Sequence, residues 1–404
     1  MKLEGARVAV VGMGRSGAAA SELLEAKGAR VTRVDQKLGN QVPKSFCGKD
    51  LIVLSPGVRA DLEELEGARK KGVAVIGDLE LASWFLQGPI IGITGSNGKT
   101  TTTALTGHIL SGCGIPAQVG GNIGTPPCAM VAASRADQWN VLELSSFQLE
   151  TIQRFHAQVG ACLNITPDHL DRHYTLERYA AAKARLFENQ TAEDWAVLNA
   201  DDPITRDLAK SLKSRVAWFC SREPFTTEVP LRGAHNLDNA TAAALIARQA
   251  GANDEQIRAA IRTFPGVEHR LEFVRTLDGV DWYNDSKATN VDAAIKALEA
   301  FPGRLWVIMG GKDKDSDYTP LGPLLKAKAH AMLLIGEAAG KIERQAGGNV
   351  PAIACVTLDK AVSEARARAR AQDTVLLAPA CASFDQFDNF EHRGREFKRL
   401  VKEL

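Results

Sequence analysis

Short β-branched segments alternate with helix-forming segments along the whole chain, and this alternation limits the fold more than any other feature of the sequence. Strands are expected at Arg7–Val11, Ile90–Thr94 and Leu305–Met309, and glycines follow each of them. Strands that alternate with helices in this way form mainly parallel sheets with helices on both faces. The sequence therefore predicts an α/β protein.

Two breaks divide the chain into three segments. Gln87-Gly88-Pro89 and Phe264-Pro265-Gly266 combine the two residues that most often interrupt regular structure. A chain of 404 residues is long enough for two to three domains of ~150 residues. We predict three α/β domains at residues 1–87, 88–266 and 267–404. The first and the last are expected to be Rossmann-like, and the central one is expected to contain a parallel sheet similar to that of P-loop ATPases.

Charge and composition exclude several classes of protein. The 49 basic and 48 acidic residues give a net charge of +1, which lacks the broad positive surface of a dedicated nucleic-acid-binding protein. The seven cysteines are scattered and form no C-x-x-C pair, as is typical of reduced thiols. No apolar stretch approaches the ~20 residues of a membrane span. We expect a cytoplasmic protein with no nucleic-acid or membrane partner.

The first glycine turn predicts a nucleotide site. Gly12-x-Gly14-x-x-Gly17 joins an expected strand to an expected helix, and Asp35 follows near the position where dinucleotide-binding folds have a ribose-binding acid. Taken alone, the pattern favours NAD(P). The backbone amides of such a turn nevertheless suit any diphosphate-linked nucleotide, and the sequence alone supports only this broader interpretation.

A second glycine loop is the sharper signal. Thr94-Gly95-Ser96-Asn97-Gly98-Lys99-Thr100-Thr101 follows an expected strand and opens an expected helix. Ile93 stands where the standard G-x-x-x-x-G-K-[ST] pattern has its first glycine, but the other parts are present. Backbone amides would surround phosphates, Lys99 would offset their charge, and the Thr100 hydroxyl would bind Mg²⁺. The loop therefore favours a nucleoside triphosphate over NAD(P).

Three further polar residues are candidates for chemistry. Glu143 ends an apolar strand, where a carboxylate can bind Mg²⁺. His169 and His173 are four residues apart but lack the glutamate of a zinc hydrolase, so His169 is equally compatible with a metal ligand and with a helix cap. Lys183 lies on the apolar stripe of residues 176–187, where a lysine usually extends to solvent.

Together these segments resemble the Mur ligases, and in particular the members that add D-glutamate. The resemblance extends over all three predicted domains and is carried by residues 94–101, 142–150, His235-Asn236 with Asn239, His269-Arg270, Asp285–Asn290 and Pro379–Glu396. It implies a monomeric, cytoplasmic enzyme of peptidoglycan synthesis. Such an enzyme uses ATP to join D-glutamate to UDP-N-acetylmuramoyl-L-alanine through an acyl phosphate.

The resemblance also implies nucleotide and metal ligands at matching positions. Two Mg²⁺ ions would be bound by Thr100, Glu143, His169 and a Lys183 that has been carbamylated by CO₂. The catalytic residues would be Lys99, Glu143, His169, Lys183 and Lys287. ATP would be bound by Gly95, Ser96, Asn97, Gly98, Lys99, Thr100, Thr101, Asn239, Arg270, Asp285 and Lys287.

The resemblance also implies ligands for the two other substrates. The UDP substrate would be bound by Ser16, Asp35, Gln36, Ser55 and Asn122. D-Glutamate would be bound by Thr289, Lys314, Ser383 and Phe390, with Lys312 as an alternative to Lys314.

Three alternative functions remain at this point. One is another amide ligase of the same superfamily, such as a different Mur ligase or folylpolyglutamate synthetase. Another is an NAD(P)-binding oxidoreductase, which would leave the loop at residues 94–101 without a purpose. The third is a non-catalytic nucleotide-binding regulator, for which an incomplete set of metal ligands would be expected.

Overall fold

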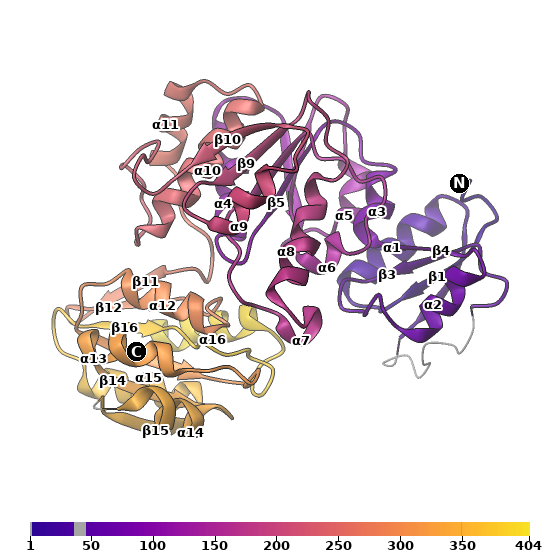
Figure 1. Cartoon of the computed structure of the whole chain (residues 1–404). Helices are drawn as coiled ribbons and strands as arrows, with labels where there is room; N and C mark the ends of the chain where they lie inside the picture. The colour runs from indigo at the N-terminus through magenta and orange to yellow at the C-terminus, as the bar shows by residue number, and fades with distance from the viewer. Residues whose placement is uncertain (1, 36–45, 349) are drawn as a thin grey trace. The chain divides into compact units, whose positions relative to one another are not determined.

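The computed structural model describes residues 2–35, 46–348 and 350–404, and their strands form three sheets (Figure 1). The chain forms two compact units, Met1–Val229 with Leu237–Phe264 and Pro230–Asn236 with Pro265–Leu404. The first two sheets belong to the first unit and the third sheet to the second. Each sheet lies within one of the three predicted segments, although the domain boundaries themselves remain a prediction. No helix in the described residues is long and apolar enough to cross a bilayer.

The first sheet is parallel and has the strand order β2-β1-β3-β4. Its strands are β1 (Arg7–Val11), β2 (Arg30–Val34), β3 (Leu51–Leu54) and β4 (Ala74–Gly77), and its helices are α1 (Arg15–Ala26), α2 (Glu63–Lys70) and α3 (Asp78–Ser83). A Cβ atom at Gly17 would lie 1.8 Å from the carbonyl oxygen of Gly12. Only glycine therefore allows α1 to begin so close to β1.

The second sheet is also parallel, and its order is β10-β9-β8-β5-β7-β6. The strands are β5 (Ile90–Thr94), β6 (Ala117–Gly121), β7 (Trp139–Glu143), β8 (Val159–Cys162), β9 (Trp195–Asn199) and β10 (Arg215–Phe219). The helices are α4 (Lys99–Gly112), α5 (Pro127–Met130), α6 (Ser146–Leu149), α7 (Leu170–His173), α8 (Leu176–Ala184), α9 (Pro203–Ala209), α10 (His235–Gln249) and α11 (Asp254–Arg262). Because β5 lies between β8 and β7, the loop that follows it is flanked by the ends of both neighbouring strands.

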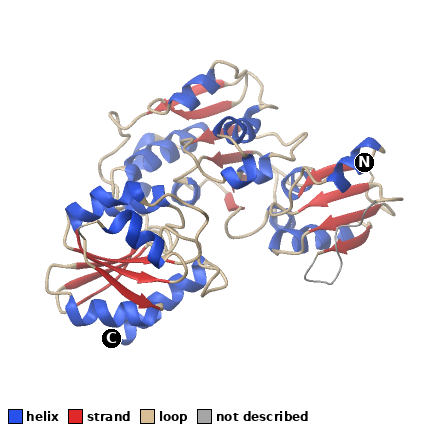
Figure 2. Cartoon of the chain, turned by 60° about the horizontal axis from the view of Figure 1, so that its bottom comes forward, coloured by secondary structure: helices blue, strands red, loops and turns tan. Residues whose placement is uncertain are grey.

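The third sheet is mixed, with the order β11-β12-β16-β13-β14-β15 and helices on both faces (Figure 2). Only the β11–β12 pair is antiparallel. The strands are β11 (Glu272–Leu277), β12 (Val280–Asn284), β13 (Leu305–Gly310), β14 (Ala329–Ile335), β15 (Ala352–Val356) and β16 (Thr374–Leu377). The helices are α12 (Val291–Glu299), α13 (Gly322–Lys328), α14 (Ala339–Ile342), α15 (Leu358–Arg368) and α16 (Phe390–Glu403).

The predicted α/β class is confirmed, and the differences lie in individual elements. The antiparallel strand β11 was not predicted, because a two-stranded hairpin leaves only a weak alternating pattern in the sequence. The last helix, α16, begins at Phe390, where the Asn389 side chain accepts the backbone N–H of His392 as an N-cap. The apolar stripe of residues 176–187 corresponds to α8, which ends at Ala184, followed by a short 3₁₀ turn over Arg185–Phe187.

A buried carboxylate connects the first sheet to the second. Glu80 of α3 is completely buried, and its oxygens accept the backbone N–H groups of Gln153, Arg154 and Phe155 at 2.8–3.0 Å. The indole N–H of Trp84 donates to the same carboxylate at 2.8 Å. A buried charge is tolerated when its hydrogen bonds are made in this way. The contact fixes α3 on the segment that follows α6.

Candidate active site

The glycine loop after β5 is shaped by its glycines and by a neighbouring strand end. Gly95 and Gly98 have φ angles of +146° and +86°, and a Cβ at Gly98 would lie 2.3 Å from the side-chain oxygen of Asn239. Asn164, just after β8, accepts the backbone N–H of Ser96 with its carbonyl oxygen and that of Asn97 with its side chain, both at 2.8 Å. The loop therefore has a defined shape before any ligand binds.

Lys99 opens α4 and folds back over this loop. Its ammonium donates to the carbonyl oxygens of Gly95 at 2.8 Å and Ser96 at 2.7 Å. Thr100 follows in the first turn and is buried. A helix N-terminus of this kind, here at the start of a 14-residue helix, is where backbone N–H groups and the helix dipole favour phosphate. The predicted phosphate-binding residues thus lie together at the carboxyl end of β5.

Lys183 is buried instead of extending to solvent, and it reaches the same loop. Its Nζ donates to the carbonyl oxygen of Gly95 at 2.8 Å and lies 4.4 Å from the ring centre of Tyr179. Burial, and to a lesser degree the neighbouring Lys99 ammonium, hold the pKa of Lys183 well below its usual value. This favours the neutral amine, which is the form that reacts with CO₂.

Glu143 lies at the end of β7, next to β5 in the sheet. The carboxylate is buried, and its Oε1 accepts the side-chain amide of Asn122 at 2.9 Å. Its Oε2 has no hydrogen-bond partner in the described part of the chain. A buried carboxylate oxygen without a donor is suited to a cation, and oxygen ligands are those that Mg²⁺ prefers. The residues present therefore fit the expected metal.

His169 and His173 occupy different environments. His169 is the N-cap residue of α7 with a φ angle of +53°, but its side chain does not make the capping hydrogen bond. Its ring lies 3.7 Å from the Asp168 carboxylate and is partly exposed. The geometry thus offers no support for the helix-cap interpretation. His173 is buried and contacts the hydroxyl of Ser146 at 2.9 Å.

Three of the residues expected to bind the UDP substrate, Ser16, Asp35 and Ser55, lie at or next to the first glycine turn. Asp35 accepts the backbone N–H of Met13, and Ser55 donates to the carbonyl oxygen of Gly12 at 2.6 Å. Ser16 lies in the first turn of α1, and its hydroxyl opposes the burial that raises the pKa of Asp78 to about 6. Gln36 lies outside the described residues. Asn122 is beside Glu143 in the second sheet.

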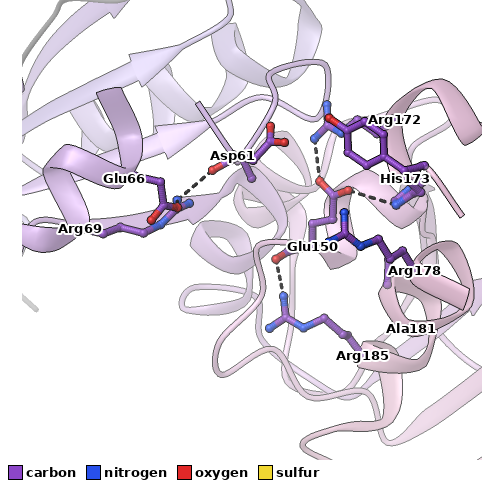
Figure 3. A pocket seen from close by; sticks show the side chains of 12 residues that line it. Asp61, Glu66, Arg69, Glu150, Arg172, His173, Arg178, Ala181 and Arg185 are labelled. Atoms are coloured by element: carbon purple, nitrogen blue, oxygen red, sulfur yellow. Dashed lines mark hydrogen bonds and ion pairs between the residues drawn. The ribbon is translucent and has the colours of Figure 1, made fainter. Parts of the chain in front are cut away.

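A pocket of about 540 Å³ opens beside α7 and α8 in the first unit (Figure 3). Its arginines are mostly paired: Arg172 contacts Glu150 at 2.6 Å and the carbonyl oxygen of Val58 at 3.0 Å, and Arg69 contacts Glu66. None of the predicted site residues lines it. The pocket is therefore separate from the residues that the sequence singled out.

In the second unit, the remaining candidates lie on loops at one edge of the third sheet. β12, β16 and β13 are adjacent and parallel, so the loops that follow them meet. Ala380 donates its backbone N–H to Ala288 at 2.9 Å, and Lys312 donates to Ala382 at 2.9 Å. The structure thus brings together the loops that carry Asp285, Lys287, Thr289, Lys312, Lys314 and Ser383, with Phe390 at the start of α16.

Asp285 and Arg270 are close in this cluster. Asp285 is completely buried, and burial raises its pKa to about 6 although Arg270 and Lys287 act in the opposite direction. Its Oδ1 and the Nε of Arg270 are buried without a hydrogen-bond partner in the described residues. The backbone N–H of Lys287 donates to the carbonyl oxygen of His269 at 3.1 Å. Two unsatisfied polar atoms here are available to a ligand.

The two candidate lysines for D-glutamate are both exposed but differ in their partners. Lys312 Nζ lies 3.5 Å from the Glu337 carboxylate, and the Lys312 backbone pairs with Ala382. Lys314 makes no ion pair within the described residues. The ammonium of Lys314 is therefore better suited than that of Lys312 to bind a carboxylate of a ligand.

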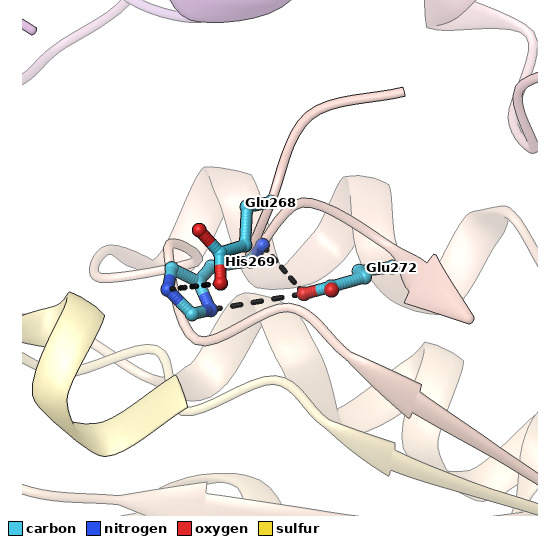
Figure 4. Close-up of side chains that lie close together, drawn as sticks. All are labelled: Glu268, His269 and Glu272. Atoms are coloured by element: carbon cyan, nitrogen blue, oxygen red, sulfur yellow. Dashed lines mark hydrogen bonds and ion pairs between the residues drawn. The ribbon is translucent and has the colours of Figure 1, made fainter. Parts of the chain in front are cut away.

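One cluster could be mistaken for a metal site. Glu268, His269 and Glu272 offer ligand atoms within 4.8 Å of one another (Figure 4). The ammonium of Lys398, however, lies 2.5 Å from Glu268 and 2.9 Å from Glu272. Burial lowers the pKa of His269, and the Asn284 amide lies 2.9 Å from its Nδ1. The lysine already provides the cation, so this is an ion-pair cluster.

Sequence reasoning missed two residues that organise the site. Asn164 accepts hydrogen bonds from the glycine loop. It is a polar residue that follows the end of a strand, and this is the same sequence signal that singled out Glu143. Arg393 of α16 is completely buried among the loops of the second unit. An arginine in a strongly amphipathic terminal helix is normally assigned to the surface, so the sequence carries no signal for it.

Comparison with known proteins identifies relatives over the whole chain. Residues 93–222 match the family described as "Mur ligase middle domain". Residues 269–381 match the family described as "Mur ligase, glutamate ligase domain". A UDP-N-acetylmuramoylalanine--D-glutamate ligase of Solibacter usitatus is 56% identical over 438 residues, covering 100% of this chain and 99% of the relative. A ligase of the same name from Koribacter versatilis is 48% identical, with 100% and 99% covered.

Solved structures share the fold at much lower identity. The UDP-N-acetylmuramate-alanine ligase of Thermotoga maritima superposes with a TM-score of 0.64 and 19% identity, covering 98% of this chain and 99% of that one. A MurF ligase of the same organism, solved with ADP, gives a TM-score of 0.65 and 17% identity, with 99% and 96% covered.

Proposed function

Because the chain belongs to the Mur ligase family, we propose that it is the ATP-dependent ligase that adds D-glutamate to UDP-N-acetylmuramoyl-L-alanine in peptidoglycan synthesis. Full-length identity of 48–56% to two ligases of that name supports this choice over another amide ligase of the superfamily and over an NAD(P)-dependent oxidoreductase. We further infer that the enzyme is monomeric and cytoplasmic.

The observation that carries the chemistry is the convergence of Lys99 and Lys183 on the carbonyl oxygen of Gly95. In the proposed reaction, the alanine carboxylate of the UDP substrate attacks the γ-phosphorus of ATP. Both groups are anionic, so the site must supply positive charge where the reacting groups meet. In this proposal, Lys99 would exchange its hydrogen bonds to the two loop carbonyls for contacts with the phosphates.

Metal ions are the second source of positive charge in this proposal. Mg²⁺, when bound, offsets the negative charge that develops during phosphoryl transfer. Thr100, Glu143, His169 and a carbamylated Lys183 would hold the two ions. The carbamate would turn a buried amine into a carboxylate-like oxygen ligand, and the unpartnered Oε2 of Glu143 would gain a partner. Formation of the carbamate requires the neutral amine that burial already favours at Lys183.

The remaining candidates would bind the three substrates. Ser16, Asp35, Gln36, Ser55 and Asn122 would bind the UDP substrate. The loop at residues 95–101 with Asn239, Arg270, Asp285 and Lys287 would bind ATP. Thr289, Lys314, Ser383 and Phe390 would hold D-glutamate, so that its amine faces the acyl phosphate and displaces phosphate. Anchors on separate loops would select the D-isomer, because inversion of the α-carbon moves the amine while both carboxylates stay bound.

Phosphate release tests the proposal. It should require ATP, the UDP substrate and D-glutamate together, and L-glutamate should be a poor replacement. Lys99→Ala should abolish the release, whereas Lys210→Ala, at an exposed lysine of the same unit, should leave it unchanged. Preference for another amino acid would assign the chain to a different ligase, and NADH turnover without ATP would overturn the proposal.

A further inference from the structure

Arg393 of α16 is a buried charge without a carboxylate partner. Its side chain is completely inaccessible to solvent, and no acid forms an ion pair with it in the part of the chain that the structure describes. Burial lowers the pKa of Arg393 only to about 10, so the guanidinium stays charged at neutral pH. A charge in this position is tolerated only when its N–H groups find acceptors.

The acceptors are oxygens of two loops. Arg393 Nε donates to the hydroxyl of Ser286 at 3.0 Å, and Nη2 donates to the Ser286 carbonyl oxygen at 2.9 Å. Nη2 also donates to the carbonyl oxygen of Cys381 at 3.1 Å, and Nη1 donates to that of Ala382 at 3.3 Å. The planar guanidinium presents its donors in a fixed arrangement. One rigid group therefore sets the spacing between the loop after β12 and the loop after β16.

Two further contacts extend this arrangement. The Ser286 hydroxyl, which accepts from Arg393, itself donates a hydrogen bond to the carbonyl oxygen of Phe390 at 2.8 Å. The loop after β13 comes within reach because Gly311 has no side chain: a Cβ there would lie 3.1 Å from Arg393 Nη1 and 2.3 Å from the Ala382 oxygen. Three ligand loops and the start of α16 thus meet at one guanidinium.

The residues held by Arg393 are neighbours of proposed ligands. Ser286 directly precedes Lys287, and Ala382 directly precedes Ser383. We propose that Arg393 is a positioning residue that fixes the distance between the Thr289 and Ser383 sides of the D-glutamate site. The proposal rests on the proposed function for its substrate, but the fixed spacing is a property of the protein without ligand.

A role limited to stability makes different predictions. If Arg393 only held α16 in place, the molecules that fold without it would keep the KM for D-glutamate. If it positions the loops, folded molecules should bind D-glutamate more weakly. The KM for the UDP substrate should not change, because its proposed ligands lie in the first unit.

The experiment compares Arg393→Lys with Arg399→Lys in the full-length protein. Arg399 lies on the same helix but is exposed and paired with Glu396 and Glu403. Lysine keeps the charge at position 393 but cannot reach both loops at once. We expect the KM for D-glutamate to rise by roughly 10-fold or more, because several charge-assisted hydrogen bonds are lost. Arg399→Lys should match the wild type.

Amide hydrogen exchange without substrates provides a readout that does not depend on the reaction. In Arg393→Lys, exchange should become faster at residues 286–289 and 381–383 and remain unchanged in the first sheet. If the proposed function fails but the positioning proposal holds, this exchange pattern will still appear. Unchanged exchange at both loops in folded Arg393→Lys, together with a wild-type KM for D-glutamate, would overturn the proposal.

Ser286→Ala provides a milder test should Arg393→Lys fail to fold. It removes one hydroxyl, which both receives the Nε hydrogen bond and donates to Phe390. We expect the same direction of change with a smaller size, roughly 3-fold in the KM for D-glutamate. A wild-type KM and wild-type exchange at residues 381–383 in this variant would contradict the proposal.

Discussion

Buried charged groups lie in different environments in the loops of the second sheet and in the loops of the third sheet. Around the first, Lys183 is buried with a strongly lowered pKa, and one oxygen of Glu143 has no partner in the described residues. Around the second, Arg393 is buried but remains charged, and loop oxygens accept its hydrogen bonds. The first region is suited to completion by bound cations and phosphates. The second holds its shape by itself.

This difference predicts two kinds of mutational effect. In the first region, loss of a buried group should lower the rate, because that group contributes to the charge at the reacting atoms. In the second, loss of a surface cation should raise the KM while the loops keep their arrangement. The four substitutions below test this contrast, from the largest expected effect to the smallest.

Lys183→Ala should have the largest effect. Because it removes the residue proposed to become a carbamate, activity should fall by roughly 10³-fold. Short carboxylic acids added to the assay should restore part of it by filling the vacant position. The control is Lys99→Ala, which the same acids should not rescue, because Lys99 acts as a cation. Full activity in Lys183→Ala without any added acid would contradict the proposed role of Lys183 as a carbamate.

Asp285→Asn tests a buried acid of the third-sheet region, where burial disfavours the charged form of the carboxyl group. The pKa of Asp285 is raised from 3.8 to about 6, so the folded protein binds its proton more tightly than the unfolded chain does. Unfolding then releases a proton between these values, and the free energy of unfolding falls as the pH rises through this window. The fall amounts to about 3 kcal/mol at most.

Asn does not titrate, so the free energy of unfolding of Asp285→Asn should not fall with pH in this way. Relative to the wild type, the variant should gain up to about 3 kcal/mol in the free energy of unfolding between about pH 4 and about pH 7. Urea unfolding at a series of pH values measures the difference. A constant difference between the two proteins across that range would show that Asp285 titrates normally.

Glu143→Gln should raise the Mg²⁺ concentration needed for activity. The amide keeps the shape of the side chain but loses the charge, and its nitrogen cannot bind a cation. We expect the half-saturating Mg²⁺ concentration to rise by roughly 10- to 100-fold. Glu193→Gln, at an exposed acid of the same unit, is the matched control and should change nothing. An unchanged Mg²⁺ requirement in Glu143→Gln would exclude it as a ligand.

Lys314→Ala should have the smallest effect. Loss of a charge-assisted contact to a carboxylate should raise the KM for D-glutamate by roughly 10-fold, with little change in the KM for ATP. Lys312→Ala is the comparison, because Lys312 already has Glu337 as a neighbour. If Lys312→Ala is impaired and Lys314→Ala is not, the D-glutamate contact belongs to Lys312.

The sequence predicts best where local pattern and tertiary position agree. Gly95–Thr101 follows a buried strand, and its residue types predict a phosphate-binding loop. The structure places this loop after β5, near the centre of the second sheet. Lys183 was singled out because it lies on an apolar helical stripe, but its proposed role came from the resemblance to the Mur ligases. Sequence alone did not show that it reaches the carbonyl of Gly95, 88 residues away in the chain.

The residues that could not be predicted are those whose role depends on long-range packing. Glu80 and Arg393 lie on helices rich in polar residues, and nothing in their local sequence distinguishes them from exposed side chains. Most of their hydrogen-bond partners are backbone groups, which have no sequence signature. The choice between Lys312 and Lys314 likewise depends on loop geometry, since the two lysines are two residues apart in one loop.

The carboxylate of Glu80 has a consequence for how the chain can be dissected. A fragment that begins after residue 87 would keep the backbone N–H groups of Gln153, Arg154 and Phe155 but lose the acceptor that satisfies them. The residues before that point would in turn carry a carboxylate that needs to be solvated. The N-terminal segment therefore cannot be exchanged freely for that of another protein. A chimera that replaces it must supply an acid at the position of Glu80.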